Sequence, residues 1–470
     1  MSDKWKNSFI KVESQGCVKI KRVPSKVRWH RGLKLILTCA RFFYWKGEKM
    51  ITKPKGTYDI YGKNTKKWQF VNKMIDEFCL CYNYEFIRTP IFESSELFHR
   101  TVGESSDIVT KETYDFKDRS DRGLTLRPEG TAGVVRSYIE NKMYGETTLP
   151  KKLYYNGTMY RYERPQSGRN REFTQFGIEV LGSNDAIMDA EVISMGYRFL
   201  EELNIPDVTV NINSLGDKES RENYKEALVK YLEPHINELC PDCQNRFKTN
   251  PLRILDCKYD ANHEVLQNVP VILDYLNEKS KKRFDEVIKY LDLLDVDYEI
   301  NPNIVRGLDY YNHTVFEFCA EVKELGNANT LGAGGRYNNL VSDLGGPETP
   351  GIGWAFGLDR IITVMDTLEI EPRGNDGVDV FVMYVNEEEK LHAISLVQDL
   401  RMSGLICETE NSGRGLKAQF KQADRLNAKQ LVILNSEDLK LGLVNIKDNR
   451  TKEEIKIGED EVLEYLISNS

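Results

Sequence analysis

The sequence predicts an α+β protein: an antiparallel sheet flanked by helices, interrupted by a helical insertion and followed by a small α/β domain. Three observations predict this fold. Strand-like apolar stretches alternate with polar turns through residues 86–180, which favours antiparallel pairing over a parallel doubly wound sheet. Residues 219–300 have a charged, helical pattern. After Ile370 the rhythm becomes strand, helix, strand, helix, which is typical of an α/β domain.

The elements of the main body follow in order. Within residues 63–84, apolar side chains recur at the spacing of one helix face, so that face is expected to pack in the core. Further along, we expect strands at 153–162, 173–180 and 314–319, helices at 277–294 and 354–365, and a glycine-rich turn at 332–335.

A polar linker, EPRGNDG, separates this body from the C-terminal part. The domain boundary is therefore placed near residue 373, with a large domain at 50–373 and a small one at 376–470. In the small domain we expect strands at 378–385, 405–409 and 431–434 and helices at 387–402 and 415–426.

Bulk composition excludes several classes of protein. The 470 residues are 40% hydrophobic and 29% charged, the mean hydropathy is −0.50, and the longest apolar runs fall short of the ~20 residues of a membrane span. No membrane partner is therefore expected. Nine scattered cysteines, an odd number, favour a reducing compartment over a disulfide framework, so we expect a cytoplasmic protein.

Residues 1–49 differ from the rest of the chain. They hold 13 Lys and Arg against three acids, a balance of +10 that leaves −18 for residues 50–470. A transit peptide, a basic RNA-binding arm and translated upstream sequence all fit this composition. We favour the last, with a disordered extension, because Gly47 to Met50 can be encoded as a ribosome-binding site followed by a start codon.

The strongest chemical signal lies in residues 155–182, YNGTMYRYERPQSGRNREFTQFGIEVLG. On an extended strand, Arg161 and Glu163 share one face while Tyr160 and Tyr162 take the other. An isolated Arg on a strand is commonly a solvated edge. Four arginines and two acids around one turn instead require an anionic ligand or paired carboxylates, and a nucleotide phosphate fits this need.

This segment resembles motif two of class II aminoacyl-tRNA synthetases, in the form used by the histidine family. Four further strings resemble the same family: IRTPIFESSELF (87–98) its motif one, with Pro90 at the subunit boundary, LRPEGTAGVVRSY (126–138) its amino-acid-binding strand and helix, RGLDYYNHTVFEF (306–318) its histidine signature, and GIGWAFGLDRI (351–361) its motif three. The resemblance covers residues 51–470. It implies the class II catalytic sheet in the large domain and an anticodon-binding domain at 376–470.

The resemblance also implies an ATP site. Arg161 would hold the α-phosphate with the two prongs of its guanidinium, and Arg306 would place a second positive charge there. Glu163 and Arg169 would contact adenine and the outer phosphates, and Arg360 would bind the γ-phosphate. Arg161 and Arg306 are thus the expected catalytic residues.

Histidine, in turn, would be bound by Glu129, Gly130, Thr131, Gln175, Glu179, Tyr310, Tyr311 and Tyr337. The two glutamates would pair with its ammonium group, assisted by Thr131, and Gln175 would lie on its carboxylate side. Tyr310 and Tyr311 would reach the imidazole. Such a pocket rejects analogues, because a missing partner leaves a buried polar group unpaired.

Several glycines have more than one explanation. Gly353 and Gly357 leave room for the nucleotide, and tight helix packing explains them equally well. The string GAGG at 332–335 lacks the G-x-G-x-x-G spacing, so we discard a dinucleotide loop. The resemblance implies that it lines the histidine pocket beside Tyr337. Asn338-Asn339 stands where the family commonly has Asp-Gly, a change that concerns fine positioning.

Cys240, Cys243 and Cys257 form a C-x-x-C pair with a third cysteine, and His263 is a conceivable fourth zinc ligand. The spacing to His263 is not a common finger pattern. We therefore expect free thiols rather than structural zinc, and no metal among the site residues.

The implied function is that of a ligase that activates histidine with ATP and Mg²⁺ to histidyl-adenylate and transfers it to tRNA(His), as a homodimer. The alternative is a non-catalytic paralogue that serves as a regulatory subunit of histidine biosynthesis. Such proteins typically lose signature residues and the C-terminal domain, whereas Arg161, Arg306, Tyr310 and Tyr311 and that domain are present. A tRNA-sensing module would come with a kinase, and no kinase signature occurs in this sequence.

Overall fold

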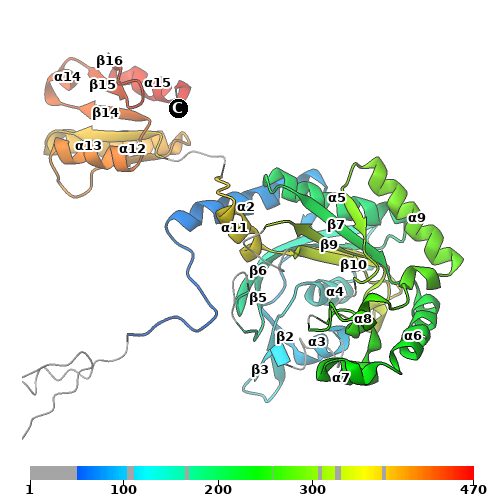
Figure 1. Cartoon of the computed structure of the whole chain (residues 1–470). Helices are drawn as coiled ribbons and strands as arrows, with labels where there is room; N and C mark the ends of the chain where they lie inside the picture. The colour runs from blue at the N-terminus through cyan, green and yellow to red at the C-terminus, as the bar shows by residue number, and fades with distance from the viewer. Residues whose placement is uncertain are drawn as a thin grey trace, which may run out of the picture. The chain divides into compact units, whose positions relative to one another are not determined.

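The computed structural model describes residues 50–102, 111–164, 169–257, 259–304, 308, 310–322, 330–372 and 377–469. The expectations for residues 1–49, for Arg306 and for the linker around residue 373 lie outside these ranges. The chain divides into a unit that ends at Lys55 and a unit that begins at Gly56. The second unit contains the sheets described below (Figure 1).

An eight-stranded sheet with the order β1-β5-β6-β11-β10-β9-β7-β8 forms the centre of the main body. All five inner pairings are antiparallel, while β1 and β8 join the two edges in parallel. The antiparallel prediction is therefore confirmed. The strands are β1 (Glu85–Phe86), β5 (Lys151–Tyr160), β6 (Glu172–Leu181), β7 (Val208–Ser214), β8 (Tyr298–Ile300), β9 (Asn312–Ala320), β10 (Thr330–Arg336) and β11 (Gly351–Gly357).

Four helices bury one face of this sheet in the largest hydrophobic core. They are α2 (Lys63–Cys81), α5 (Ala186–Glu202), α9 (Glu278–Leu293) and α11 (Leu358–Thr367). The predicted helix over 63–84 is confirmed as α2, and its Val71 and Ile75 are fully buried. An ion pair of 2.8 Å between Lys67 and Asp366 joins α2 to α11.

Along strands β6 and β11, successive side chains point alternately into the hydrophobic core and towards the opposite face of the sheet. On β6, Phe176 and Ile178 enter the core, whereas Gln175 and Glu179 face a cavity. On β11 the large residues of GIGWAFG alternate with glycine and alanine. The predicted helix at 354–365 is therefore wrong in its first part, since the strand runs to Gly357. A short apolar run does not distinguish a strand from a buried helix.

The expected glycine-rich turn at 332–335 is also wrong, because these residues lie inside strand β10. A Cβ atom on Gly332 would lie 2.2 Å from Phe356 Cδ1, and one on Gly334 would lie 2.3 Å from the carbonyl oxygen of Gly353. These glycines allow close approach of neighbouring groups rather than a change of chain direction.

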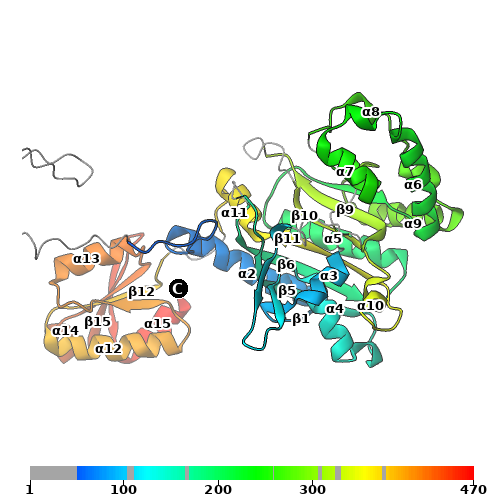
Figure 2. The same ribbon diagram turned by 90° about the horizontal axis from the view of Figure 1, so that it is seen from below.

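Smaller elements lie outside the eight-stranded sheet (Figures 1 and 2). A three-stranded sheet, β2-β4-β3, and two helices precede β5, and a helical segment that Figure 2 shows as a separate group lies between β7 and β8. The elements are β2 (Phe92–Ser94), α3 (Ser95–Val102), β3 (Tyr114–Lys117), β4 (Gly123–Leu126), α4 (Thr131–Glu140), α6 (Lys218–Leu232), α7 (Pro241–Thr249), the 3-10 turn η4 (Pro251–Ile254), α8 (Glu264–Gln267) and α10 (Leu340–Asp343).

The C-terminal part has its own five-stranded sheet, in the order β13-β12-β14-β15-β16. The predicted alternation of strands and helices is confirmed as far as β14; the elements beyond residue 434 were not predicted. They are β12 (Val380–Tyr384), α12 (Glu387–Met402), β13 (Cys407–Thr409), α13 (Leu416–Arg425), β14 (Gln430–Leu434), α14 (Ser436–Lys440), β15 (Leu443–Asp448), β16 (Glu454–Gly458) and α15 (Val462–Ser468). Among the described residues, no helix is both long enough and apolar enough to span a bilayer.

Candidate active site

A cavity of ≈ 670 Å³ lies over the free face of the central sheet. Most of the predicted site residues line it, although they come from distant parts of the sequence: Glu129, Thr131, Arg161, Glu163, Arg169, Gln175, Glu179, Tyr310, Tyr311, Tyr337 and Arg360. Gly130 instead lies beneath the ring of Tyr155, where a Cβ atom would come within 2.3 Å of that ring. Arg306 lies outside the described residues.

Glu179 is the central carboxylate of the cavity. It is 1% exposed, and it accepts hydrogen bonds from Thr131 Oγ1 at 2.6 Å and from the Tyr337 hydroxyl. Burial raises the pKa of Glu179 to about 8, in spite of these two hydrogen bonds, which favour the charged form. The protonation of this group can therefore change near neutral pH when a charged ligand binds.

Glu129 has a structural task that the sequence did not indicate. Its carboxylate accepts backbone hydrogen bonds from Thr131 at 2.7 Å and from Ala132 at 2.9 Å, at the first turn of α4. Burial raises the pKa of Glu129, and the two backbone donors oppose that shift. The positive end of the helix thus holds a carboxylate at the cavity wall.

Three buried polar atoms at this end have no hydrogen-bond partner among the described residues: Tyr155 Oη, Gln175 Oε1 and Tyr310 Oη. Leaving such a group unpaired costs on the order of 1–3 kcal/mol. All three residues line the cavity. They therefore indicate where a polar ligand supplies the missing partners.

Tyr155 was missed as a site residue. Its ring fits only because Gly130 and Gly177 have no side chains, since a Cβ atom on either residue would lie within 2.4 Å of it. The sequence signal was its place at the head of the arginine-rich segment. Nothing in that string says that two glycines from other elements lie against the ring.

Three tyrosines form the aromatic wall of the cavity. The rings of Tyr310 and Tyr311 lie 4.6 Å apart between centroids, and Tyr310 meets Tyr337 edge-on at 5.8 Å. The Tyr337 hydroxyl contacts Glu179 although the next residue is Asn338, where the family commonly has Asp. The Asn338 side chain accepts a hydrogen bond of 3.2 Å from Arg336 Nη1.

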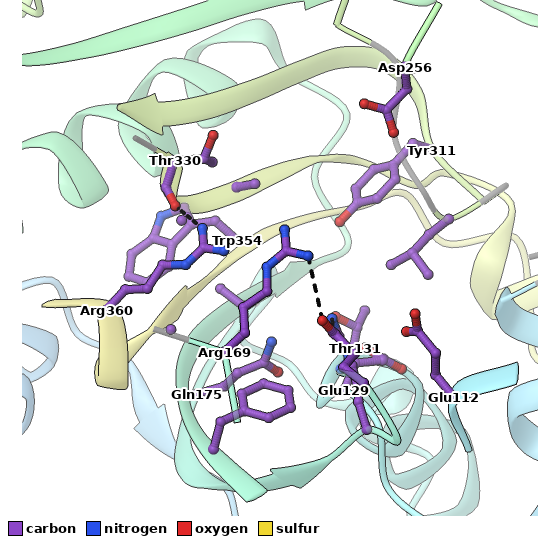
Figure 3. Close-up of a pocket in the computed structure, with 18 of the residues that line it drawn as sticks. Glu112, Glu129, Thr131, Arg169, Gln175, Asp256, Tyr311, Thr330, Trp354 and Arg360 are labelled. Atoms are coloured by element: carbon purple, nitrogen blue, oxygen red, sulfur yellow. Dashed lines mark hydrogen bonds and ion pairs between the residues drawn. The ribbon is translucent and has the colours of Figure 1, made fainter. Parts of the chain in front are cut away.

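The opposite end of the cavity is cationic. Arg161 donates from Nε to the carbonyl oxygen of Pro128 at 2.8 Å, and Arg169 pairs with Glu163 at 3.5 Å. Arg360 donates to the carbonyl oxygen of Thr330. Figure 3 shows Arg169 and Arg360 extending into the cavity, with Tyr311 on the side away from Arg360.

Electrostatics at this end favour an anion. Burial lowers the pKa of Arg360, and the charge of Arg169 lowers it further. A bound phosphate would stabilise the charged form of Arg360, because its negative charge compensates for the lost hydration and for the repulsion by Arg169.

Asp359 organises this end and was missed by the sequence analysis. It accepts hydrogen bonds from Tyr58 Oη at 2.6 Å, from Asn170 Nδ2 at 3.2 Å and from the backbone N–H of Thr174 at 2.8 Å. It thereby ties the start of α11 to the segment around Arg169. The only sequence signal was its position beside Arg360.

Gly353 and Gly357 have different reasons to be glycine. A Cβ atom on Gly353 would lie 2.1 Å from Glu179 Oε2 and 2.3 Å from the carbonyl oxygen of Ile178, whereas one on Gly357 would meet nothing within 4 Å. Both residues line the cavity from strand β11. Helix packing therefore explains neither glycine.

One wall of the cavity comes from the segment between α6 and α8, which includes Cys240, Arg253 and Cys257. No sequence pattern placed this segment at the site. The sulfurs of Cys240 and Cys257 lie 3.7 Å apart. His263 is engaged elsewhere, since its Nδ1 accepts a hydrogen bond of 3.3 Å from the backbone N–H of Val265.

Comparison with known proteins identifies the family of the chain. The family model of histidyl-tRNA synthetase matches residues 56–361, and that of the anticodon-binding domain matches residues 379–469. Histidine–tRNA ligases of Bacillus cytotoxicus and Bacillus subtilis are 49% and 48% identical to the chain over 413 and 416 residues; each match covers 88% of the chain and 98% of the relative. The crystal structure of the apo S. aureus histidyl-tRNA synthetase is 41% identical, with a TM-score of 0.77 over 89% of the chain and 100% of that structure.

Proposed function

The chain belongs to the histidyl-tRNA synthetase family and is a histidine–tRNA ligase, and from this premise we propose how its cavity activates histidine. Histidine binds at the end with Glu129 and Glu179, and ATP binds at the end with the arginines. One observation carries this assignment: a single cavity joins unpartnered buried polar atoms at one end to clustered guanidinium groups at the other.

At the histidine end, Glu179 receives the ammonium group, and Glu129 adds a second negative charge beside it. The Tyr310 hydroxyl, which has no hydrogen-bond partner among the described residues, binds an imidazole nitrogen together with Tyr311. Gln175 lies on the carboxylate side of the substrate. Because Tyr310 Oη and Gln175 Oε1 are buried without a hydrogen-bond partner among the described residues, an analogue that lacks the atom matching either of them binds poorly.

At the ATP end, a carboxylate oxygen of histidine attacks the α-phosphorus. The bond from that phosphorus to the bridging oxygen breaks, and pyrophosphate leaves. Arg161 neutralises the α-phosphate, and Arg306, assigned from the family signature alone, supplies the second charge. Glu163 and Arg169 contact adenine and the outer phosphates, and Arg360 binds the γ-phosphate. Catalysis consists of positioning and charge stabilisation.

Magnesium fits this site as an ion carried by ATP. The carboxylates at the phosphate end are already engaged: Asp359 accepts three hydrogen bonds, and Glu163 pairs with Arg169. Mg²⁺ commonly binds through substrate phosphates and water rather than through an all-protein cage. When bound, it would neutralise phosphate charge.

The second half-reaction transfers the histidyl group to the terminal adenosine of tRNA(His), with residues 376–470 holding the anticodon region. We propose that the protein works as a homodimer in the cytoplasm, as its family resemblance and its cysteine usage predict. The dimer contact would include the exposed apolar side chains of Phe86, Ile91, Phe92 and Phe116. The first three lie close to Pro90 in the sequence, and Phe116 meets Phe92 edge-on.

Histidine-dependent exchange of pyrophosphate into ATP tests the activation reaction. We expect exchange with L-histidine and none without it, whereas a regulatory paralogue or a tRNA sensor would give none in either case.

Tyr310→Phe tests which end of the cavity binds histidine and which binds ATP, because it removes only the hydroxyl. The KM for histidine should rise about tenfold or more, while the KM for ATP stays unchanged. The opposite pattern would refute the proposed orientation.

A further inference from the structure

We propose that Cys240, Cys243, Cys257 and Asp260 form a binding site for one Zn²⁺ ion beside the active-site cavity. One ligand atom from each of the four residues lies within 4.8 Å of every other. Cys240 is half-buried and the other three are buried. We expected free thiols because the spacing between the cysteines and His263, the conceivable fourth ligand, is uncommon in zinc sites. The structure places Asp260 beside the three cysteines instead.

Local structure explains why the first two sulfurs meet. Cys240 caps the N-terminus of α7, Pro241 is its first residue, and Cys243 lies in its first turn. Cys240 has extended backbone angles, and from this N-cap position its side chain lies near the third residue of the first turn, Cys243. Proline at the first helical position has the backbone angle that a helix start requires.

The other two ligands come from the turn after η4, and backbone groups hold them in place. The backbone N–H of Cys240 donates to Asp260 Oδ2 at 3.0 Å, and that of Asp260 donates to Cys257 Sγ at 3.5 Å. Such outer hydrogen bonds to ligand atoms orient the ligands of metal sites. These two backbone hydrogen bonds therefore hold Cys240, Cys257 and Asp260 close to one another.

Two of the six separations between ligand atoms match the edges of a tetrahedral zinc site, and all six lie within 4.8 Å. With Zn–S near 2.3 Å and Zn–O near 2.0 Å, the edges of a tetrahedron are about 3.8 Å between two sulfurs and about 3.5 Å between sulfur and oxygen. Cys240 Sγ and Cys257 Sγ lie 3.7 Å apart, and Cys257 Sγ and Asp260 Oδ2 lie 3.6 Å apart. A disulfide would bring the sulfurs to about 2.05 Å.

The donor set selects the metal and its role. Three thiolates favour zinc over magnesium or calcium, which prefer oxygen ligands. Four protein ligands complete a tetrahedron and leave no open position for a reactant, so the ion is structural. Because Cys240 and Cys257 also line the cavity, the ion would fix the wall over the histidine-binding end.

Metal content of the full chain, purified under reducing conditions and supplied with zinc, tests the proposal. We expect one zinc per chain by elemental analysis. Replacement by Co²⁺ should give one cobalt per chain, with the intense thiolate-to-cobalt absorption and visible bands of a tetrahedral site. Content far below one ion per chain after reconstitution would refute the site. So would a Cys240–Cys257 disulfide in place of bound metal.

Variants identify the ligands. Cys243→Ser and Asp260→Asn should weaken zinc binding by at least about tenfold, whereas the controls Cys319→Ser and His263→Asn should retain one ion per chain. Loss of zinc in His263→Asn with retention in Asp260→Asn would show that the fourth ligand is wrong. If Cys243→Ser does not fold, the wild-type cobalt titration still decides. Chelation should also lower the Tm of the wild type by several degrees.

Discussion

Thr131 Oγ1 donates a hydrogen bond of 2.6 Å to Glu179 Oε1 and so joins the first turn of α4 to the C-terminal part of strand β6. The two residues are 48 positions apart in the sequence. This contact and the Tyr337 hydroxyl hold a buried carboxylate whose pKa is nevertheless raised to about 8. The protonation of Glu179 should therefore be coupled to ligand binding.

At pH 7, Glu179 in the ligand-free protein is mostly protonated, whereas an ammonium group requires the carboxylate. Histidine binding at pH 7 should release about one proton, and affinity should weaken up to about tenfold per pH unit between pH 8 and 6.5. Calorimetry in buffers of different ionisation enthalpy measures that proton. Glu179→Gln should abolish the release, and the control Glu191→Gln should retain it. Equal release in all three proteins would contradict the assignment.

The same shift predicts a change in stability with pH. A carboxyl pKa raised from 4.5 to about 8 on folding stabilises the folded state below the unfolded pKa, and this stabilisation is lost as the pH rises towards 8. The Tm of ligand-free wild type should therefore fall relative to that of Glu179→Gln between pH 5 and 8. Parallel pH profiles of the two proteins would contradict this.

Gly353→Ala and Gly357→Ala should behave differently. The first places a methyl group against Glu179 and against the backbone at Ile178, which cannot move away. It should cost about 1–3 kcal/mol of stability and raise the KM for histidine. The second meets no atom within 4 Å, so the Tm should be unchanged while the KM for ATP rises. Thermal unfolding and exchange kinetics measure both. Equal effects of the two substitutions would refute the distinction.

Arg306→Lys should slow adenylate formation by roughly two orders of magnitude, on the scale of one lost transition-state donor. Lysine keeps the charge but loses the planar fork that matches two phosphate oxygens. Histidine affinity should change little, because the charge that Arg306 meets develops later. Single-turnover activation and equilibrium binding on the folded variant separate this role from a structural ion pair, which would cost stability and binding together.

Removal of residues 376–470 should leave histidine-dependent pyrophosphate exchange largely intact while aminoacylation of tRNA collapses. Among the described residues, those that line the cavity fall between Glu112 and Arg360, and the C-terminal sheet has separate hydrophobic clusters. Both reactions are measured on the shortened chain, after circular dichroism has shown that it is folded. Loss of exchange in a folded, dimeric protein would place the boundary elsewhere.

Phe92→Asp should dissociate the proposed homodimer. Phe92 is 52% exposed and meets Phe116 edge-on at 6.2 Å, and an aromatic side chain that serves as an interface hot spot contributes at least about 2 kcal/mol. Analytical ultracentrifugation should show a dissociation constant at least about 30-fold higher. The control Leu293→Asp, at an exposed position on α9, should remain dimeric. A dimer unaffected by Phe92→Asp would exclude this surface.

Sequence patterns were sufficient to predict an element where the local order of residues alone determines its structure. The face of α2 followed from helical spacing, and the alternation of strands and helices in the C-terminal part followed from short local signals. Patterns were insufficient where two structures share a local appearance. Strand β11 has an apolar run that a buried helix could also have, and strand β10 has glycines that a turn could also have. Their glycines are instead required by side chains on neighbouring strands: Gly332 lies against Phe356, and Gly353 lies against Glu179.

The sequence by itself determined the chemical groups available to this protein: a cluster of guanidinium groups, several carboxylates, the tyrosine hydroxyls and three closely spaced thiols. Only the tertiary structure decided which of these groups meet. It buried Glu179 and thereby raised its pKa, because desolvation depends on what surrounds a group and not on its neighbours in the chain. It also brought Asp260 rather than His263 to the cysteines, because a backbone turn set by hydrogen bonds, not residue spacing, fixes which ligand reaches them.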